Sequence, residues 1–406
     1  MNSPTAKPLA PAPDLGHPRG LGSYLNIFFA TLAGLSLGLG CWQWLAALRF
    51  PLHRRPPPPA RPPALTLLKP LRGCDDTTRV SLQSWLEQAY AGPAQILFGV
   101  ADARDPVAEL VRQLLRQFPR ADAQLVVCGQ VLGANGKIST LIQLERLARH
   151  GLILVSDADV RVPPDFLDQI VPHLEDSGVG LVNCFYRLAN PRTRAMHWET
   201  IAVNADFWSQ VLQSATLKAP DFALGAVMLT RRSALAEIGG FAALADCLAD
   251  DYQLGRRLAE KGHRIALGSV VVECWDKPMN WREVWKHQLR WARTIRVCQP
   301  LPYFMSILAN ATLWPLLWLA TALLVTHSRR AALLAAACLL GRILMAWHLQ
   351  RRFTPDRRLV SPHWLVPVKD MLNFLVWTNA FLGNTVEWRG QRLRLRPDGT
   401  LLRQTH

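Results

Sequence analysis

The sequence predicts an α/β protein, with a parallel sheet and connecting helices inserted between apolar segments near the two ends. Two observations carry this prediction. Strand-like and helix-like apolar patterns alternate from Ala64 to about Gly268, which is typical of a parallel sheet with helices on both faces. Long uncharged runs precede and follow that region, where they fit membrane-spanning helices. Chemistry is therefore expected in the middle of the chain.

Composition narrows the class of protein. Half of the 406 residues are hydrophobic, which excludes a disordered chain, and the formal net charge is +16. A basic chain favours nucleic acid, anionic lipid or phosphorylated substrates. The apolar ends favour lipid, and no RNA-binding aromatic motif is visible, so no nucleic-acid partner is expected. Eight cysteines without a C-x-x-C pair argue against a zinc ribbon or a disulfide framework, and suit a cytosol-facing domain.

The N-terminal region predicts a membrane anchor. Residues 1–23 are rich in Pro, Gly and Ala and are expected to be disordered. Tyr24–Leu48 runs without a charge and is long enough, at about 1.5 Å per residue, to cross a hydrocarbon core of roughly 30 Å. A buried helix is the alternative. Residues 49–63 form a basic, proline-rich linker, whose charge predicts the cytoplasmic side.

The central region, residues 64–296, is expected to be one cytoplasmic catalytic domain. Ligands of such sheets bind beyond the carboxyl ends of the strands. The expected strands are Leu65–Leu71, Gln95–Ala101, Ala123–Cys128 and Leu152–Ser156, and the expected helices are Thr78–Tyr90, Pro106–Phe118 and Lys137–His150.

The C-terminal region, residues 297–388, is expected to return to the membrane. Ile307–Thr326 and Ala331–Leu349 are span candidates. Trp364–Val386 contains charged residues and has basic flanks, so an interfacial or re-entrant helix is favoured, with a further span as the alternative. Residues 389–406 form a basic tail. The prediction is a multi-pass membrane protein, most simply of a bacterial inner membrane.

Carboxylates at strand ends are the first candidates for chemistry. Asp157 and Asp159 follow the strand Leu152–Ser156, and two carboxylates so spaced can hold one Mg²⁺ or Mn²⁺, although a polar turn is the alternative. Asp102 ends another strand, where its side chain could accept hydrogen bonds from a base or ribose or simply cap a helix.

Three further motifs complete a phosphate-handling pattern. Lys137 begins a helix and could neutralise a diphosphate. Asp250 and Asp251 open an amphipathic helix, either as partners of the helix dipole or with one of them as a general base. Arg290 and Trp291 could bind a phosphorylated leaving group, or belong to a basic helix anchored at the membrane surface.

In this order the motifs resemble those of membrane glycosyltransferases with the GT-A fold, and more closely those of the ceramide glucosyltransferase-like family, glycosyltransferase family 21. The full D-x-D and LRWARTIR are most similar to bacterial members linked to hopanoid lipids. The resemblance rests on LLKPLRG at Leu67–Gly73, D-x-x-D-P at Asp102–Pro106, NGKIS at Asn135–Ser139, SDADVRVPPDFL at Ser156–Leu167, ADDY at Ala249–Tyr252, LRWARTIR at Leu289–Arg296 and WRGQRLRLR at Trp388–Arg396.

The resemblance implies roles on the donor side. Asp102 would hold the uridine of a UDP-sugar, with Lys69, Pro70 and Leu71 lining that pocket. Lys137 would meet the nucleotide or its diphosphate. Asp157 and Asp159 would hold the divalent metal and the diphosphate.

On the acceptor side, Asp251 would be the base, with adjacent Asp250 as the other possibility, and Arg290 and Trp291 would line the acceptor and diphosphate. His287 stands where the family has Gln or Arg, so its role stays open.

The implied reaction is an inverting transfer of a hexose or N-acetylhexosamine from a UDP-sugar to the hydroxyl of a membrane lipid, either ceramide or a hopanoid polyol. A processive polysaccharide synthase shares the fold and the Arg-Trp motif and is the main alternative, although such enzymes usually have more membrane helices. A non-catalytic membrane-anchored binding protein is the third, but it would not need these acids and Lys137 at strand and helix ends.

Overall fold

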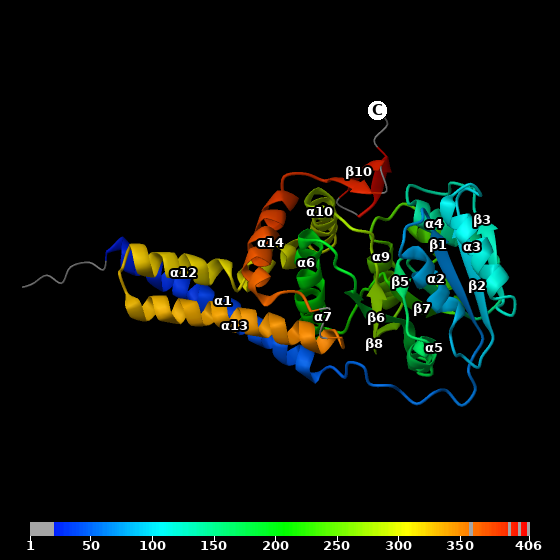
Figure 1. Cartoon of the computed structure of the whole chain (residues 1–406), viewed down its shortest axis with the longest axis horizontal. Helices are drawn as coiled ribbons and strands as arrows, with labels where there is room; N and C mark the ends of the chain where they lie inside the picture. Colours follow the sequence, from blue (N-terminus) through cyan, green and yellow to red (C-terminus); the bar gives the residue numbers. More distant parts are fainter. Residues whose placement is uncertain (1–19, 357–359, 389–390, 397–398, 404–406) are drawn as a thin grey trace, which may run out of the picture.

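A mixed sheet of eight strands is the centre of the region between the apolar ends of the chain (Figure 1). The computed structural model describes residues 20–356, 360–388, 391–396 and 399–403. The predicted disorder of residues 1–23 therefore falls almost entirely outside the described residues, and the first helix begins at Leu21. The strand order is β3-β2-β1-β4-β7-β6-β8-β5.

The first half of the sheet is parallel, as expected. Runs of buried apolar residues form β1 (Leu65–Leu71), β2 (Ala94–Val100) and β4 (Leu152–Ser156), while β3 (Ala123–Val127) lies at the edge and is partly exposed. The connecting helices are α2 (Thr78–Leu86), α3 (Pro106–Gln117) and α4 (Gly136–Glu145). Strands and helices thus alternate where the sequence predicts them, within a few residues.

The second half departs from a wholly parallel sheet. β7 (Val227–Arg231) pairs antiparallel with both β4 and β6 (Val179–Leu188), and β8 (Arg264–Cys274) pairs parallel with β6 and antiparallel with the short β5 (Val160–Arg161). The chain runs outward from β1 through β2 to β3 and then returns to place β4 on the other side of β1. The acids after β4 therefore lie at a topological switch point, where ligands of such sheets bind.

Helices cover both faces of the sheet and bury two apolar layers. Side chains of α2, α3 and the short α5 (Phe166–Ile170) pack on one face. Side chains of α4, α8 (Arg232–Glu237) and α9 (Asp250–Glu260) pack on the other. Short 3-10 turns lie at Val171–Leu174 and Phe241–Leu244. The strands between them are fixed from both sides, which holds their carboxyl ends in place.

Three helices extend from the domain as a bundle (Figure 1). They are α1 (Leu21–Arg49), α12 (Leu313–Leu324) and α13 (Arg329–Phe353). Among the described residues, α1 and α13 are long and apolar enough to cross a membrane, and α11 (Pro300–Met305), its 3-10 extension to Ala309 and α12 form a pair bent by 42° that makes a third candidate.

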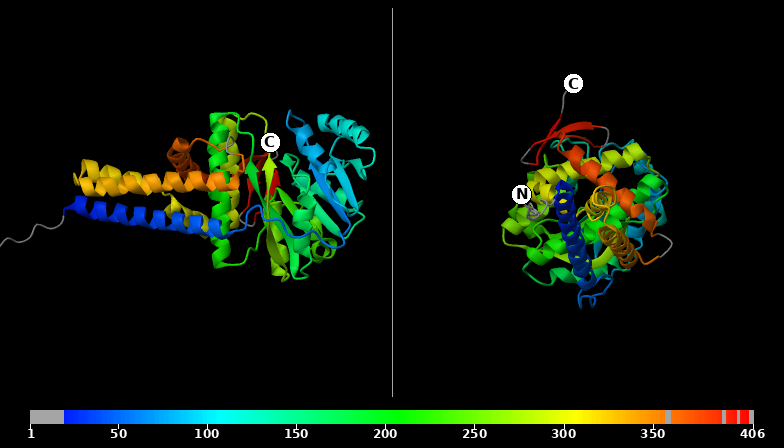
Figure 2. Two further views of the ribbon diagram at one scale, coloured as in Figure 1. Left: turned by 60° about the horizontal axis from the view of Figure 1, so that its bottom comes forward. Right: turned by 90° about the vertical axis from the view of Figure 1, so that its left-hand side faces the viewer.

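A second set of helices lies across the base of this bundle (Figure 2). It contains α6 (Arg194–Ile201), a π-helical turn at Ala202–Phe207 and α7 (Trp208–Leu217), which continue one another, together with α10 (Trp281–Cys298). α14 (Val366–Ala380) joins them and packs mainly on α10 and α6, and the 3-10 turn His363–Leu365 before it packs on α13. α14 has 15 residues, fewer than the roughly 20 that a span needs.

Buried charges join the bundle to these crossing helices. Arg342 of α13 donates to Asp206 at 3.0 Å and to Asp370 at 2.9 Å, and Lys369 pairs with the same two carboxylates. The two cations and two anions leave no net charge among the four side chains, and their mutual attraction offsets the desolvation penalty of burying them. The set connects α13, α14 and the π-helical turn.

The C-terminal tail contributes a small antiparallel sheet of β9 (Thr385–Trp388), β10 (Gln391–Leu395) and β11 (Leu401–Arg403). Leu393, Leu395 and Leu401 pack on Val386 of β9 and on Leu248, which lies just before α9. Residues 389–390, 397–398 and 404–406 of the predicted basic tail lie outside the described residues.

Candidate active site

The D-x-D motif lies directly after β4. Asp157 has a side chain that is 39% exposed, and Asp159 is more enclosed. Burial and the neighbouring Asp157 raise the pKa of Asp159. Two carboxylates that repel each other in an enclosed place are suited to a cation.

Lys69 supports this motif from beneath. Its side chain is fully buried in β1, over the ring of Trp85, and its Nζ donates to the Asp157 carbonyl oxygen at 2.5 Å and to Ser156 Oγ at 3.2 Å. Burial lowers the pKa of Lys69 to about 7 despite the charges of Asp159 and Asp157. Lys69 thus holds the backbone of the motif, and its neighbours Pro70 and Leu71 are also buried.

Lys137 joins two of the predicted acidic motifs. It lies in the first turn of α4, where Asn135 caps the helix by accepting hydrogen bonds from the Lys137 and Ile138 backbone amides. Lys137 Nζ lies 2.8 Å from Asp157 Oδ1 and 2.9 Å from Asp250 Oδ2. Burial alone would lower the pKa of Lys137, but the two carboxylates together raise it, so the ammonium stays charged.

Asp251 lies beside this ion-paired group at the N-terminus of α9. Its Oδ1 accepts a hydrogen bond of 2.8 Å from the Tyr252 backbone amide. Its Oδ2 lies so close to Gly225 that a Cβ at that position would be 2.7 Å away, so the loop before β7 needs glycine there. Burial and the charge of Asp250 raise the pKa of Asp251 to about 6. A carboxylate with a pKa near neutrality is suited to general-base catalysis.

Helix α10 places the Arg-Trp motif and His287 near these acids. Asn280 and Glu283 form a capping box that starts the helix. His287 Nδ1 lies 2.7 Å from Oε1 of Glu199, which is 1% exposed, and the His287 ring packs on Trp291 at 4.4 Å between centroids. His287 also acts electrostatically on Asp159. Arg290 is half-buried on the same helix.

Asp102 lies apart from this group. It follows β2, is exposed, and pairs with Arg104 at 3.0 Å, which lowers the pKa of its carboxyl. Asp105, rather than Asp102, caps α3. The structure therefore brings together Lys137, Asp157, Asp250 and Asp251, with Asp159 near Lys69 and His287. Asp102 lies beyond the end of β2, two strands along the sheet from β4.

The similarity of this chain to a known protein family covers most of its length. Residues 28–401 match the family model described as glycosyl transferase family 21. The chain belongs to this family. The predicted family, glycosyltransferase family 21, is therefore confirmed.

Individual relatives agree with this assignment. The chain is 26% identical over 228 residues to ceramide glucosyltransferase 3 of Caenorhabditis elegans, covering 55% of this chain and 49% of the relative. It is 24% identical over 221 residues to ceramide glucosyltransferase 1 of the same organism, covering 54% and 47%. The chain thus spans about half the length of the curated relatives it matches.

The fold also has a solved counterpart. The chain is similar to the mannosyltransferase PcManGT from Pyrobaculum calidifontis, solved in complex with GDP-Man and Mn²⁺, with a TM-score of 0.54 and 21% identity, covering 89% of this chain and 99% of that one. This likeness confirms the predicted GT-A fold.

Two acidic residues of this family 21 site were not predicted from the sequence. Glu199 Oε1 accepts a hydrogen bond of 2.8 Å from Gln288 of α10, yet it lies on a helix distant in sequence. Asp276 follows β8, and burial together with Asp159 and Glu199 raises its pKa to about 8. An acid directly after a strand is the signal that could have indicated Asp276, but no pattern indicates Glu199.

A divalent cation fits the donor set of this family 21 chain. Among the described residues, no three His, Cys, Asp or Glu side chains form a ready-made cage. Asp157 and Asp159 offer two carboxylates, which matches the way Mg²⁺ is bound by one or two carboxylates plus substrate phosphates. The raised pKa values of Asp159 and Asp276 mark an excess of enclosed negative charge that a cation would offset.

Proposed function

We propose that this glycosyltransferase moves a hexose or N-acetylhexosamine from a UDP-sugar to the hydroxyl of a membrane lipid, such as ceramide or a hopanoid polyol, with inversion. The observation that carries the proposal is the half-buried Asp251. Its pKa is raised to about 6, and it lies beside the Lys137–Asp157–Asp250 group at a topological switch point.

The UDP-sugar donor is assigned to the edge of the sheet at which the parallel strands β1, β2 and β4 end. Asp102 binds the uridine, beside the segment Lys69–Leu71. Lys137 has a positive charge held in place by two carboxylates, so it can exchange part of this pairing for the diphosphate without moving far. Burial of its side chain, which is 7% exposed, keeps that attraction strong.

The acceptor is assigned to the side that faces α10 and the helix bundle. Its hydroxyl oxygen bonds to the anomeric carbon from the face opposite UDP, while the bond from that carbon to the diphosphate oxygen breaks. Asp251 accepts the hydroxyl proton. Arg290 stabilises the departing diphosphate, and Trp291, packed against His287, forms a wall for the acceptor.

Asp157 and Asp159 are the residues that would hold Mg²⁺ or Mn²⁺. When bound, the cation supplies charge stabilisation to the diphosphate leaving group. Lys69 keeps the backbone of this motif in position through its hydrogen bond to the Asp157 carbonyl oxygen.

A membrane location with the catalytic domain on the cytoplasmic side is part of the proposal. α1, α13 and the bent α11–α12 pair span the bilayer, and the basic residues that follow α1 and end α13 lie on the cytoplasmic side. α14 lies in the interface, because it is short and crosses the base of the bundle (Figure 2). A bacterial inner membrane fits this topology.

The deciding experiment is transfer from radiolabelled UDP-sugars by purified protein in lipid, with and without EDTA, followed by lipid extraction. Metal-dependent label in one lipid band is expected. Label in a polymer would instead indicate a processive synthase. Absence of both transfer and UDP binding by folded protein would contradict the proposal.

A further inference from the structure

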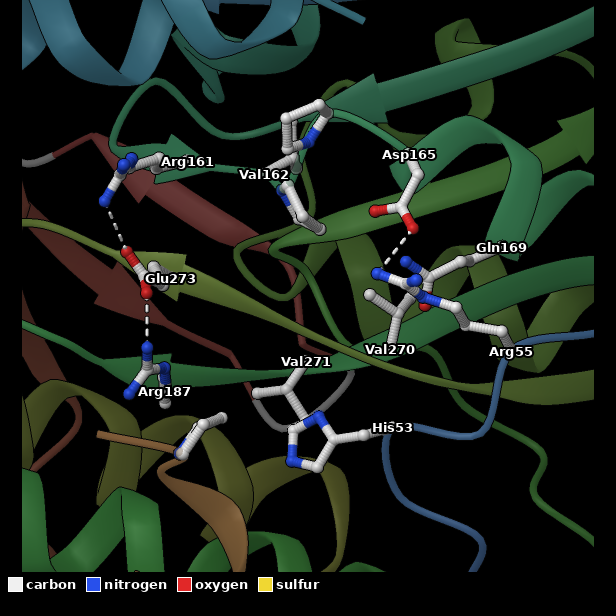
Figure 3. A pocket seen from close by; sticks show the side chains of 13 residues that line it. His53, Arg55, Arg161, Val162, Asp165, Gln169, Arg187, Val270, Val271 and Glu273 are labelled. Atoms are coloured by element: carbon white, nitrogen blue, oxygen red, sulfur yellow. Dashed lines mark hydrogen bonds and ion pairs between the residues drawn. The ribbon is translucent and has the colours of Figure 1, made fainter. Parts of the chain in front are cut away.

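A separate cavity of about 390 Å³ lies at the edge of the sheet formed by β5 and β8 (Figure 3). This volume is in the range of small-molecule sites. The cavity is lined by the linker after α1, the strands β5, β6 and β8, and Pro355 just after α13. The residues assigned above to transfer do not line it, so the cavity is distinct from the proposed active site.

Arginines dominate the polar lining. Arg55, Arg161 and Arg187 face it, against the two carboxylates of Asp165 and Glu273. Figure 3 shows Glu273 between Arg161 and Arg187, and Asp165 opposite Arg55. These five side chains leave one positive charge in excess.

Both carboxylates are already engaged. Glu273 Oε2 accepts from Arg161 Nη1 at 3.2 Å and from Trp275 Nε1 at 2.8 Å, and Oε1 accepts from Arg187. Asp165 Oδ2 pairs with Arg55 at 2.8 Å. The carboxylates therefore hold the guanidinium groups in place, and an additional anion would meet arginines that are already positioned.

Arg187 has a donor left over. Its side chain is 9% exposed, and its Nη1 is buried without a hydrogen-bond partner among the described residues. A buried unpartnered donor on a charged group is costly, and native proteins rarely leave one unless a ligand or water completes it. The excess charge and this donor both favour an anion.

The other residues that line the cavity also favour binding of an anion. Val162, Val270 and Val271 supply apolar wall, which weakens screening by water. His53 lines the cavity too, and burial, with the charges of Arg187 and Arg352, lowers its pKa, so His53 does not add to the repulsion between cations. Arg352 itself donates to the last carbonyl groups of α1, which places the cavity beside the ends of α1 and α13.

We propose that this cavity binds a phosphate group, held by Arg161 and Arg187 with Arg55 at the rim. The volume leaves room for a small organic part beside the phosphate. The chemistry suits either the phosphomonoester head group of an anionic lipid or a soluble phosphate.

The test uses the full-length protein and two probes. Inorganic phosphate is titrated into detergent-solubilised protein by calorimetry. In parallel, protein is reconstituted in phosphatidylcholine nanodiscs with phosphatidic acid, and retained lipid is counted by native mass spectrometry. The test variant is Arg55→Gln/Arg161→Gln, which changes two partly exposed residues. The control Arg149→Gln/Arg264→Gln removes two similarly exposed arginines, each paired with an acid elsewhere on the domain.

The wild type and the control are expected to bind, and the test variant to bind at least about tenfold more weakly, which is the loss expected for one charge-assisted hydrogen bond. Binding of inorganic phosphate alone identifies a soluble ligand, and retention of phosphatidic acid identifies a lipid. The proposal is overturned if the wild type binds neither inorganic phosphate nor phosphatidic acid, or if the wild type and the test variant bind with equal affinity. A melting curve of each variant verifies folding, and neither readout depends on glycosyl transfer.

Discussion

Lys137 Nζ lies 2.9 Å from Asp250 Oδ2, and this contact distinguishes two adjacent acids that the sequence alone leaves equivalent. Asp250 is tied to the ammonium, which also holds Asp157. Asp251 has no ion-pair partner in the described part of the chain, and its pKa is raised to about 6. The paired acid is suited to fixing Lys137, and the unpaired acid to accepting a proton.

The first prediction separates these roles. Asp251→Asn is expected to lower kcat by about 10²–10⁴-fold, since the base is lost, with UDP affinity unchanged. Asp250→Asn is the matched control: it is expected to weaken UDP binding because Lys137 loses a partner, with a smaller loss in kcat. Calorimetry with UDP and initial transfer rates give the two quantities. Near-normal turnover of Asp251→Asn beside an inactive Asp250→Asn would place the base at Asp250.

The second prediction concerns pH. A base must be deprotonated to act, so kcat/KM should fall as the pH drops through about 6, the pKa of Asp251, with a slope of one proton. Rates measured between pH 5 and 8 test this. The residual activity of Asp251→Asn should lack that limb, and an identical limb in the variant would assign it to another group.

The third prediction concerns stability. The pKa of Asp251 rises from its ordinary value of 3.8 to about 6 on folding, so the folded state binds more protons between those values and loses stability as the pH rises through that window. Asp251→Asn should therefore raise Tm at pH 7 relative to wild type, with the gain shrinking toward pH 4. A lower Tm for Asp251→Asn at pH 7 would show that the charged form contributes to folding.

Much of the fold could be predicted because its signals are local. Short apolar runs mark β1 and β4 with the observed bounds, and the Asn135–Lys137 cap marks the start of α4. The antiparallel β7 could not be predicted in this way, because a buried strand has the same apolar pattern whichever direction it runs.

The site was predictable to a similar degree. Acids and Lys137 at element ends are visible in the sequence, whereas the pairing of Lys137 with Asp250 depends on two segments meeting across the sheet. Glu199 lies within α6 on a helix without any site motif, and only the packing of α6 on α10 brings it to His287.

The fourth prediction tests Glu199 as a positioning residue. Glu199→Gln should lower kcat by about tenfold or more, while KM for the UDP-sugar stays unchanged. The reason is that the carboxylate beside His287 Nδ1 loses its charge, the charge-assisted hydrogen bond from Gln288 is weakened, and Trp291 is no longer held. Glu237→Gln is the control, since Glu237 pairs with His263 at 2.8 Å elsewhere on the domain.

A comparison of two substitutions at His287 distinguishes positioning by Glu199 from a general structural role. The residue at position 287 is Gln or Arg in the family that the motif resembles, so His287→Gln should keep more activity than His287→Ala. Equal loss in the two His287 variants, or a fall in Tm of Glu199→Gln that matches its loss of kcat, would show that the pair serves folding alone.

The fifth prediction concerns the metal. Asp157 and Asp159 can supply only two carboxylates, so affinity for the cation without nucleotide should be weak and should rise when UDP is present, because the diphosphate completes the ligands. EDTA should abolish transfer, and added Mn²⁺ should restore it. Asp159→Asn should raise the Mn²⁺ concentration needed for half-maximal rate by about tenfold or more, whereas Asp168→Asn, on α5, should leave it unchanged. Full activity of the wild type in EDTA would instead leave Lys137 and Arg290 as the cations that stabilise the leaving group.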